Sequence, residues 1–347
     1  MKINIKTSDD IRTLMKMHVI PAAVTTALEL HLFWYLNDQA LSLEEISQDL
    51  EIPVDRCHYW LELLVELGLL KREHMRYTPT SLSQSAILES YSSESWSFLA
   101  QAAREQYITG NNLALHISHP KSVLTAQEEK SPDWFKRIQE DLNYARQFTY
   151  ALYELHYYSG ETLAQALNMK GVRRLMDLGG GSGVVSLALL KRHPDLTAVV
   201  IDIPNVCVIG REIAAKTTVS DRIVYQVADY DHDDLPTGFD MILNCDAGGF
   251  NHELLCKLFK SLNEGGQLIV VSNIEMDSEW LETRPREHLN FPLLLRYFQN
   301  SLTASKLTHM TISEAKKRLN KAGFRSVIEK TLENGILIIR GKKSNVA

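Results

Sequence analysis

The stretch LMDLGGGSGVVSLALL, residues 175–190, decides the fold. An apolar run ends at Leu178, four glycines follow within five positions, and the segment after Gly183 has the apolar content of a buried helix. In open α/β sheets the ligand lies at the carboxyl ends of the strands, where a glycine-rich turn lets backbone N–H groups and a helix N-terminus approach it. The stretch therefore predicts a strand, a ligand-binding turn and a helix.

After residue 172 the chain alternates short β-rich runs with helical segments. The continuous apolar character of these runs favours a parallel sheet that is covered on both faces and built from βαβ units. The expected strands are RRLMDLG (173–179), TAVVID (197–202), RIVYQVAD (222–229), FDMILNCDA (239–247) and QLIVVSNI (267–274). Residues 325–342 predict a hairpin that adds one antiparallel strand to the sheet.

The N-terminal part of the chain predicts a winged helix-turn-helix unit. Residues 22–36, AAVTTALELHLFWYL, indicate a buried helix, and Ser42 with Glu45 forms the capping box of a second helix that ends at EIP. Residues 54–70 have apolar side chains at helical spacing, and KREHMRYTPT (71–80) offers two short extended pieces around a turn. Together these elements have the order of a winged helix.

The charges of this unit argue against DNA binding. In a winged helix the third helix would enter the major groove, but here residues 54–67 set one arginine against the carboxylates of Asp55, Glu62 and Glu66. The whole chain has a formal net charge of -6, whereas a phosphate backbone is bound by surplus Lys and Arg. We therefore expect no nucleic-acid partner and favour a packing or dimerisation role for the unit.

Residues 86–170 indicate a largely helical region that is rich in aromatic side chains. Three tyrosines in its second half share one helical face, Tyr150, Tyr153 and Tyr157, and Tyr144 and Tyr158 stand nearby. Such a stripe forms core more often than a ligand wall, although tyrosine offers an aromatic substrate both a flat ring and a hydroxyl. Both interpretations stay open from the sequence.

Length and composition indicate a globular protein. With 347 residues, 45% apolar and 23% charged, the chain is long enough for two folded units and shows no sign of disorder.

The cysteines lack the spacings of a metal site or a disulfide framework, so we expect no metal. They are Cys57, Cys207, Cys245 and Cys256. The start, MKINIKTSDDIRTL, lacks a signal peptide's apolar segment, and no run of about 18 apolar residues occurs. We therefore expect a cytoplasmic protein with no membrane partner.

The glycine turn matches neither of the two common phosphate-binding patterns. A P-loop needs GxxxxGK[ST], and the residues after Gly179 do not supply the lysine. A dinucleotide fingerprint, GxGxxG, would need a third glycine where Val184 stands. What remains is a DxGxGxG pattern formed by Asp177, Gly179, Gly181 and Gly183.

Two further carboxylates end the next two predicted strands. Asp202 ends the second strand, where a carboxylate can accept both hydroxyls of a ribose. Asp229 ends the third strand and precedes Tyr230, so a carboxylate for an exocyclic amine stands beside an aromatic ring for a purine face. These motifs contain no lysine or arginine that could bind a phosphate. The sequence therefore predicts a nucleoside ligand without a phosphate.

Four stretches, LMDLGGGSG, VVIDIPNV, VADYDHDDLP and LNEGGQLIVV, together resemble the class I S-adenosylmethionine-dependent methyltransferases. The resemblance is to the small-molecule O-methyltransferases typified by the plant caffeic acid and the hydroxyindole enzymes, and it covers nearly the whole chain. It implies an α/β fold in three parts: a winged-helix dimerisation domain (1–85), a helical linker and substrate-pocket region (86–170), and a Rossmann-like, seven-stranded cofactor domain with an antiparallel last strand (171–347). It also implies a homodimer formed through the N-terminal domain.

The resemblance further implies methyl transfer from S-adenosylmethionine to a small-molecule acceptor. We expect an aromatic or polyketide-like natural product, with oxygen favoured over nitrogen or carbon as the methylated atom. The turn would flank the methionine part of the cofactor, Asp202 would hold the ribose, and Asp229 with Tyr230 would hold the adenine. The expected cofactor-binding residues are Asp177, Gly179, Gly181, Gly183, Asp202, Asp229, Tyr230 and Cys245.

The catalytic pattern of that family is missing. Its members carry a general base in a His-Asp-Trp stretch soon after the fourth strand, and alignment of FDMILNCDAGGFNHELLCKLF sets Gly249, Phe250 and Asn251 at those positions. Two glutamates that normally flank the base are also absent. The fifth strand ends in Ser272, and His309 in THMT occupies the second glutamate position.

Loss of the usual base does not exclude methyl transfer. Alignment of the reactants alone strongly accelerates an in-line displacement, whereas a base adds about 100-fold to 10,000-fold when the acceptor must lose a proton. Candidate substitute bases are His309 and His252, the latter following the expected N-cap Asn251, although a histidine in a first turn is often only a solvated surface residue. Asp246 could orient the substrate or cap a turn.

Two other functions stay open. Some proteins of this fold family keep the cofactor but no longer transfer its methyl group, and use it in decarboxylation, hydroxylation or ring formation. A ligand-sensing regulator with a winged helix is the third interpretation, which the charges of the third helix disfavour.

Overall fold

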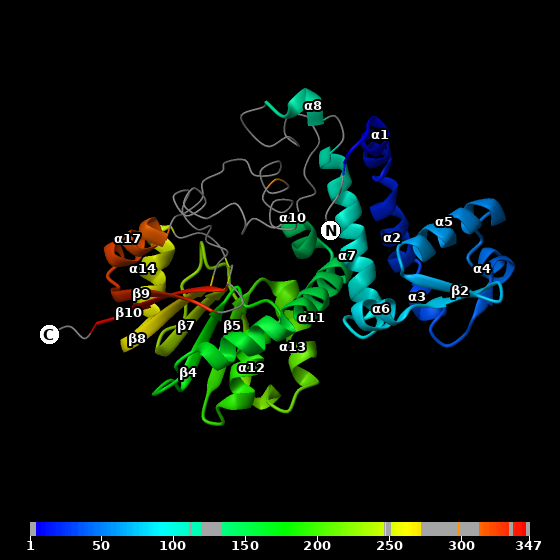
Figure 1. Cartoon of the computed structure of the whole chain (residues 1–347). Helices are drawn as coiled ribbons and strands as arrows, with labels where there is room; N and C mark the ends of the chain where they lie inside the picture. The colour runs from blue at the N-terminus through cyan, green and yellow to red at the C-terminus, as the bar shows by residue number, and fades with distance from the viewer. Residues whose placement is uncertain are drawn as a thin grey trace. The chain divides into compact units, whose positions relative to one another are not determined.

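The protein is described by a computed structural model, shown in Figure 1, that covers residues 5–110, 113–118, 134–245, 247, 251–271, 298, 312–332 and 336–344. The chain divides into two compact units, residues 1–129 (unit 1) and residues 130–347 (unit 2). The helices of the middle region are shared between them, since α7 (Ser93–Gly110) lies in unit 1 and α11 (Leu142–Ala166) lies in unit 2.

Unit 1 combines helices with a small antiparallel sheet. Besides α7, its elements are α1 (Ser8–Lys16), α2 (Val19–Glu29), α3 (Leu32–Tyr35), β1 (Leu41–Ser42), α4 (Leu43–Asp49), α5 (Val54–Glu66), β2 (Leu70–Glu73), β3 (Arg76–Pro79), α6 (Ser81–Ser83), the π-helical turn η1 (Gln84–Leu88) and α8 (Leu113–His116). The strand order is β1-β3-β2. Helix, strand, two helices and a hairpin follow one another as expected for a winged helix.

The segment 22–36 is not the single helix that the sequence predicts. α2 ends at Glu29, and α3 begins at Leu32, because His31 between them adopts a left-handed backbone conformation with a φ of 55°. A helix cannot continue through that conformation. After the break, Phe33 and Leu36 are fully buried in the core of unit 1.

The predicted capping box of α4 is confirmed. The Ser42 hydroxyl accepts a hydrogen bond from the N–H of Glu45 at 3.3 Å, and the Glu45 carboxylate accepts one from the N–H of Ser42 at 2.7 Å. Each side chain thus satisfies a donor that the first helical turn leaves unpaired. The same helix ends as expected before Glu51, whose φ is 54°.

Unit 2 is built on a seven-stranded mixed sheet flanked by helices. Its strands are β4 (Arg174–Leu178), β5 (Thr197–Asp202), β6 (Ile223–Val227), β7 (Phe239–Cys245), β8 (Leu262–Val271), β9 (Arg325–Thr331) and β10 (Leu337–Lys342). Besides α11, its helices are α10 (Trp134–Glu140), α12 (Val184–Arg192), α13 (Pro204–Ala215), the short 3₁₀ helix η2 (Ser220–Arg222), α14 (His252–Ser261) and α17 (Ile312–Lys321).

The strand order is β6-β5-β4-β7-β8-β10-β9. The pairs from β6 to β8 are parallel, and β10 is antiparallel to both of its neighbours, so the predicted antiparallel last strand is confirmed. From the central strand β4 the chain builds outward to β5 and β6, and then returns to add β7 on the other side. A ligand crevice is expected where the order reverses in this way, at the carboxyl ends of β4 and β7.

The strand β8 begins earlier than its predicted start at Gln267. Leu262 pairs with Phe239 of β7, and Gly265 and Gly266 exchange backbone hydrogen bonds with Lys343. Because these contacts come from distant parts of the chain, the glycine-rich LNEGG segment carried no local sign of a strand.

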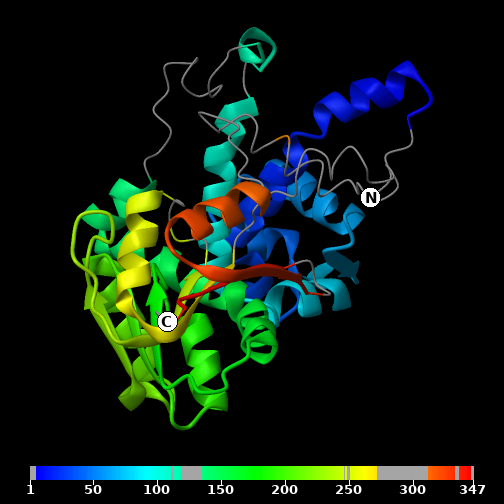
Figure 2. The same cartoon turned by 90° about the vertical axis from the view of Figure 1, so that its left-hand side faces the viewer.

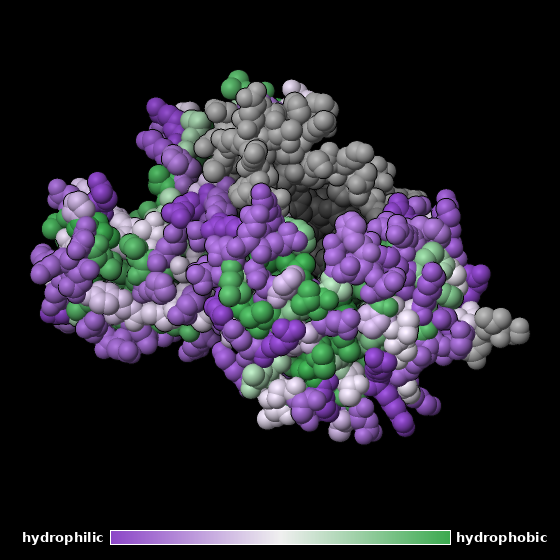
Figure 3. Space-filling model, turned by 180° about the vertical axis from the view of Figure 1, so that it is seen from behind, coloured by the Kyte–Doolittle hydropathy of each residue, from purple (hydrophilic) through white to green (hydrophobic). Residues whose placement is uncertain are grey.

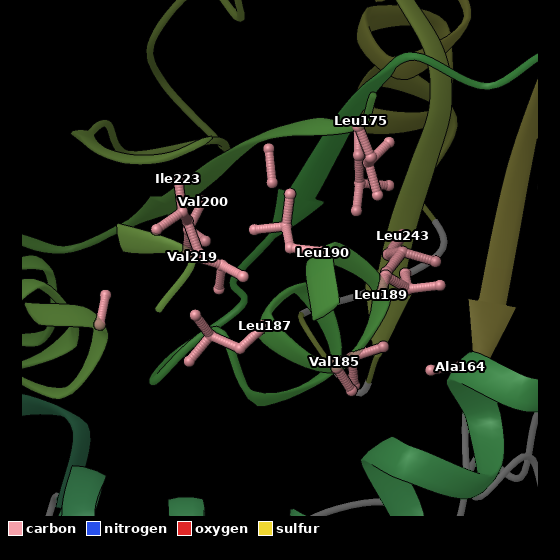
Figure 4. Close-up of a cluster of buried hydrophobic side chains, with 14 of the residues drawn as sticks. Ala164, Leu175, Val185, Leu187, Leu189, Leu190, Val200, Val219, Ile223 and Leu243 are labelled. Atoms are coloured by element: carbon pink, nitrogen blue, oxygen red, sulfur yellow. The ribbon is translucent and has the colours of Figure 1, made fainter. Parts of the chain in front are cut away.

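Alternate residues of the strands face two separate cores. Leu175 of β4 packs with α11, α12 and α13, whereas its neighbour Met176 packs with α14 and α17. Figures 1 and 2 show these two sets of helices on opposite faces of the sheet. Figure 4 shows part of the first core, where Leu187 and Leu190 of α12 lie near Val200 of β5. Both faces are covered, which explains the continuous apolar runs.

The tyrosine stripe lies on α11 and is mainly core. Tyr144 is buried, and Tyr150 and Tyr153 pack against the first core of unit 2. Lys216, the C-cap of α13, donates a hydrogen bond to the Tyr150 hydroxyl at 2.8 Å. Tyr158, in contrast, is 78% exposed. These contacts favour the core interpretation over a ligand wall.

The surface of the described residues is mixed. Figure 3 shows hydrophilic side chains over much of one face, with hydrophobic side chains in smaller patches between them. In the described part of the chain, no helix has the length and apolar character needed to cross a bilayer. Nor do the described residues bring together three or more His, Cys, Asp or Glu side chains that could hold a metal ion.

Candidate active site

The glycine turn, residues 179–183, connects the carboxyl end of β4 to α12. Gly179, Gly181 and Gly183 have φ values of 58°, 59° and 74°, which fall in the left-handed region that glycine tolerates. Gly183 is the N-cap of α12. The predicted strand, turn and helix are therefore all present at the switch point of the sheet.

Two of these glycines differ in what surrounds them. A Cβ atom on Gly179 would lie 2.3 Å from the Cβ atom of Ala247, so the turn and the segment after β7 approach each other too closely for any side chain. Among the described residues, no atom lies within 4 Å of the place where a Cβ atom on Gly181 would stand. The turn is thus closed on the Gly179 side, and the described residues leave an open space above Gly181, which we call the cradle.

The turn has few of the features that bind phosphate. Three of its N–H groups already donate to protein oxygens: Gly179 to Ile201 at 2.7 Å, Gly181 to the Asp202 carboxylate at 2.9 Å, and Gly183 to Gly180 at 2.8 Å. A phosphate-binding turn directs such groups at the ligand instead. With a carboxylate bonded to its centre, the turn favours a neutral or cationic ligand.

Asp177 lies beneath the turn. Its side chain is buried, and the Ser186 hydroxyl of α12 donates a hydrogen bond to its carboxylate at 2.7 Å. Burial raises the pKa of Asp177 to about 6, while the Ser186 hydrogen bond opposes this rise and the nearby Asp202 charge adds to it. The structure therefore joins the turn to the first helical turn of α12 through this carboxyl group.

Asp202, at the end of β5, faces the same turn. One carboxylate oxygen accepts the Gly181 N–H, and the other accepts the N–H of Ile203 at 2.8 Å. Burial raises the pKa of Asp202, and these two hydrogen bonds act against the rise. Because a carboxylate has about four lone-pair sites, it can still accept hydrogen bonds from two further donors such as ribose hydroxyls.

Asp229 and Tyr230 follow β6. The Tyr230 ring lies against the turn, since its Cε1 atom is 3.8 Å from the place where a Gly179 side chain would begin. The Asp229 carboxylate accepts a hydrogen bond from Nδ1 of His232 at 2.8 Å, and this contact lowers the pKa of Asp229. Tyr230 therefore lies beside the turn, and the exposed Asp229 precedes it in the chain.

The carboxyl end of β7 completes this edge of the sheet. Cys245 is the last residue of the strand and packs at the margin of the first core. The buried Asn244 side chain accepts a hydrogen bond from the N–H of Ala247 at 3.1 Å, which fixes Ala247 above Gly179. The turn, the β6 end and the β7 end thus meet at one place.

The candidate catalytic residues are placed less completely. Asn251 is the N-cap of α14, as predicted, because its side chain accepts the N–H of Leu254 at 2.7 Å. His252 is the first residue of that helix, and its side chain is exposed and lies 3.7 Å from the Cys256 sulfur. His309, Asp246 and the position of the missing base, Gly249, lie outside the described residues.

Sequence reasoning missed several residues that shape the site. Ser186, Asn244 and Ala247 act through contacts with the turn or with the strand ends. Tyr225 of β6 donates a hydrogen bond to the carbonyl of Ser182 at 2.7 Å, beneath the start of α12. The contacts of Tyr225 with Ser182 and of Ala247 with Gly179 join distant parts of the chain that only the folded sheet brings near, so no local pattern indicates them.

Comparison with known proteins agrees with this geometry. The O-methyltransferase domain family matches residues 122–324, and the O-methyltransferase dimerisation domain family matches residues 13–88. A 3-hydroxy-5-methyl-1-naphthoate 3-O-methyltransferase of Streptomyces sahachiroi is 28% identical over 74% of both chains. The N,N-dimethyltransferase OxyT of Streptomyces rimosus is 24% identical over 87% of this chain and 86% of its own.

A solved structure shows the same fold. The human N-acetylserotonin methyltransferase in complex with SAM superposes with a TM-score of 0.76 at 19% sequence identity, over 99% of this chain and 100% of that chain.

Proposed function

The chain belongs to the O-methyltransferase family, and from this premise we propose that it methylates a small aromatic or polyketide-like natural product, with oxygen as the favoured acceptor atom. It is an S-adenosylmethionine-dependent methyltransferase. The naphthoate-methylating relative supports the acceptor class. The observation that carries the proposal is the open cradle above Gly181, whose N–H donates to the half-buried Asp202 carboxylate.

The residues of the site fit the cofactor. The Asp202 carboxylate, which has acceptor capacity left, would hold the ribose hydroxyls. Asp229 and Tyr230 would hold the adenine, and the cradle above Gly181 would take the methionine part. Asp177 would support the turn from beneath, and Cys245 would border the cofactor at the end of β7.

Charge supports a sulfonium ligand over a nucleotide. Asp202 and Asp177 set two carboxyl groups against the turn, and the N–H groups of Gly179, Gly181 and Gly183 already donate to protein oxygens. When bound, S-adenosylmethionine supplies an electrophilic methyl group on a positively charged sulfur. The carboxylates attract that charge, whereas they would repel a phosphate.

The acceptor must lose a proton when it is a neutral hydroxyl. We propose that His252 or His309 accepts this proton, and that Asp246 orients the acceptor. The exposed position of His252 at the start of α14 supports this role, because an acceptor can reach an exposed imidazole. His252→Ala or His309→Ala is expected to lower turnover by about 100-fold or more with little change in cofactor affinity. Unchanged turnover in both variants would mean that catalysis proceeds by positioning alone.

The decisive test combines binding and product analysis. Titration calorimetry with S-adenosylhomocysteine is expected to show binding to the wild type and a loss of about 100-fold or more in Asp202→Ala, because a buried ribose hydroxyl pair loses its acceptor. Asp195→Ala, an exposed carboxylate before β5, is the control and is expected to bind like the wild type. Formation of S-adenosylhomocysteine with candidate phenols then measures methyl transfer. Equal affinity in Asp202→Ala would refute the assignment of the site.

A second candidate activity is considered because the sequence alignment sets Gly249 at the position of the family's base. A methyltransferase-fold enzyme could bind the cofactor and catalyse decarboxylation, hydroxylation or cyclisation without methyl transfer. Product formed from an acceptor without release of S-adenosylhomocysteine would favour this activity. An amine acceptor is the alternative within methyl transfer, and the N,N-dimethyltransferase relative supports it.

We further propose that the protein is a cytoplasmic homodimer formed through unit 1. The dimerisation domain at residues 13–88 supports the homodimer. The acidic residues of α5 support the absence of a nucleic-acid partner, since Glu62 pairs with Arg72 and Tyr77 rather than leaving a basic surface.

A further inference from the structure

Lys257 of α14 is held by three backbone carbonyls. Its ammonium group donates hydrogen bonds to the carbonyl oxygens of Asp231 at 2.8 Å, Asp233 at 3.1 Å and Tyr230 at 3.3 Å. The side chain is half-buried. An ammonium group has three donors and no acceptor, so these carbonyls can take all of its hydrogens.

The three carbonyls belong to one short loop, residues 229–233, which also bonds to itself. The N–H of Asp233 donates to the carbonyl of Asp229 at 2.6 Å, and the N–H of Asp229 donates to the carboxylate of Asp233 at 2.8 Å. The N–H of Asp231 donates to the Asp229 carboxylate at 3.0 Å. The loop is thus a closed turn that carries Asp229 and Tyr230, with its carbonyls converging on Lys257.

These contacts join two parts of the site. Lys257 stands on the helix that begins with His252, and the 229–233 loop places the Tyr230 ring against Gly179. Hydrogen bonds from a charged donor are stronger than those between neutral groups. Without the ammonium group, the three carbonyls would lose their common donor, and the loop would be tied to α14 only by weaker contacts.

We propose that Lys257 is a positioning residue for the cofactor, which fixes the 229–233 loop on α14 so that Asp229 and Tyr230 are held ready for the adenine. This inference rests on the proposed function, because it assumes that these two residues bind the adenosine part. Lys257 contacts the backbone of the loop and does not itself bind the ligand. Its effect is therefore on affinity for adenosine-containing ligands.

The test compares variants of the full-length protein by titration with S-adenosylhomocysteine and with adenosine. Lys257→Met keeps the length of the side chain and removes all three donors, and it is expected to weaken both ligands about tenfold or more. Lys260→Met is the matched control, because Lys260 is an exposed lysine of the same helix. It is expected to bind both ligands like the wild type.

Two more variants separate positioning from general stability. Lys257→Arg keeps a charged donor and is expected to recover most of the lost affinity. In Lys257→Gln the half-buried position stays polar, but the shorter side chain does not reach all three carbonyls. This variant is expected to bind both ligands weakly, and it serves as the test if Lys257→Met does not fold. Titrations far below each variant's unfolding midpoint remove the effect of stability, and amide hydrogen exchange of residues 229–233 should be faster in the weak binders alone.

The outcomes distinguish the two proposals. If the wild type does not bind S-adenosylhomocysteine, the proposed function fails. If the wild type binds and both Lys257→Met and Lys257→Gln bind within twofold of it, the positioning role is refuted while the proposed function stands. Equal weakening in Lys260→Met would also refute it, because the effect would then come from charge alone.

Discussion

At the scale of single residues, two glycines of the turn are expected to be needed for different reasons, one for the fold and the other for ligand binding. Gly179 has no room for a side chain because Ala247 lies against it, whereas Gly181 has open space and needs glycine only for its backbone conformation. A substitution at Gly179 therefore damages the fold. A substitution at Gly181 adds atoms where the cofactor would lie.

We expect Gly181→Ala to lower cofactor affinity far more than stability. The left-handed conformation costs a non-glycine residue roughly 1–2 kcal/mol, and the new methyl group would occupy the cradle. Gly171→Ala is the control, since Gly171 has a φ of 80° and open space but lies before β4, away from the carboxyl edge. Both variants should lose similar stability in urea unfolding, and only Gly181→Ala should bind S-adenosylhomocysteine weakly. Equal binding by the two variants would contradict the placement of the ligand.

A second prediction concerns Asp177 and pH. Burial raises the pKa of this carboxyl from 3.8 to about 6 in the folded protein, so the folded state binds the proton more tightly than the unfolded chain does. Its stabilising contribution is fully present below about pH 3.8 and is lost as pH rises through 6, a change of about 3 kcal/mol.

Asp177→Asn removes this titration while keeping an acceptor for the Ser186 hydroxyl. The difference in unfolding free energy between wild type and variant should therefore shift in favour of the variant between pH 4 and pH 7, as measured by urea unfolding at several pH values. A difference that stays constant over this range would show that the buried carboxyl does not titrate there.

At the scale of elements, the sequence predicted the strands better than the helix ends. Continuous apolar runs such as TAVVID mark strands buried on both faces, and this signal is local. The break between α2 and α3 at His31 has no such signal, because neither glycine nor proline marks it. The start of β8 was missed since its partners come from residue 343. The sequence did not indicate contacts between residues that are far apart in the chain.

The packing of α11 on α12 leads to a prediction at this scale. Gly160 of α11 is buried, and its Cβ position would lie 3.4 Å from a methyl group of Val184. Gly160→Ala fits this space and gains helix propensity, so we expect stability to rise by up to about 1 kcal/mol. Gly160→Leu overfills the same space and should cost about 1–3 kcal/mol. Urea unfolding of the two variants checks the difference, and similar stabilities would show that the helices are not in close contact at this point.

At the scale of the whole molecule, the sequence indicated which of the proposed cofactor-binding residues would lie together, and it did not indicate the residues that would bind the acceptor. The glycine turn, Asp202, Asp229 and Tyr230 stand at strand ends, and parallel strands bring such ends to one edge. Lys257 shows the limit, because its contacts with the 229–233 loop span 24 to 27 positions of sequence without any motif. Acceptor recognition depends on side chains from several segments, and no local spacing encodes such a pocket.

The last prediction concerns assembly through unit 1. No residue of α1 is buried, yet Ile11 and Met15 lie four positions apart on one face and are 44% and 66% exposed. Together with the dimerisation domain at residues 13–88, this uncovered apolar face points to a second copy as the partner that buries it.

Sedimentation velocity of the wild type should therefore show a dimer at micromolar concentration. Met15→Asp should raise the dimer dissociation constant by about tenfold or more, because a charge would be buried without a partner. Thr13→Asp adds the same charge at another exposed position of the helix and should dimerise nearly as the wild type does. A wild type that stays monomeric, or two variants that dissociate alike, would exclude this face of α1 from the dimer interface.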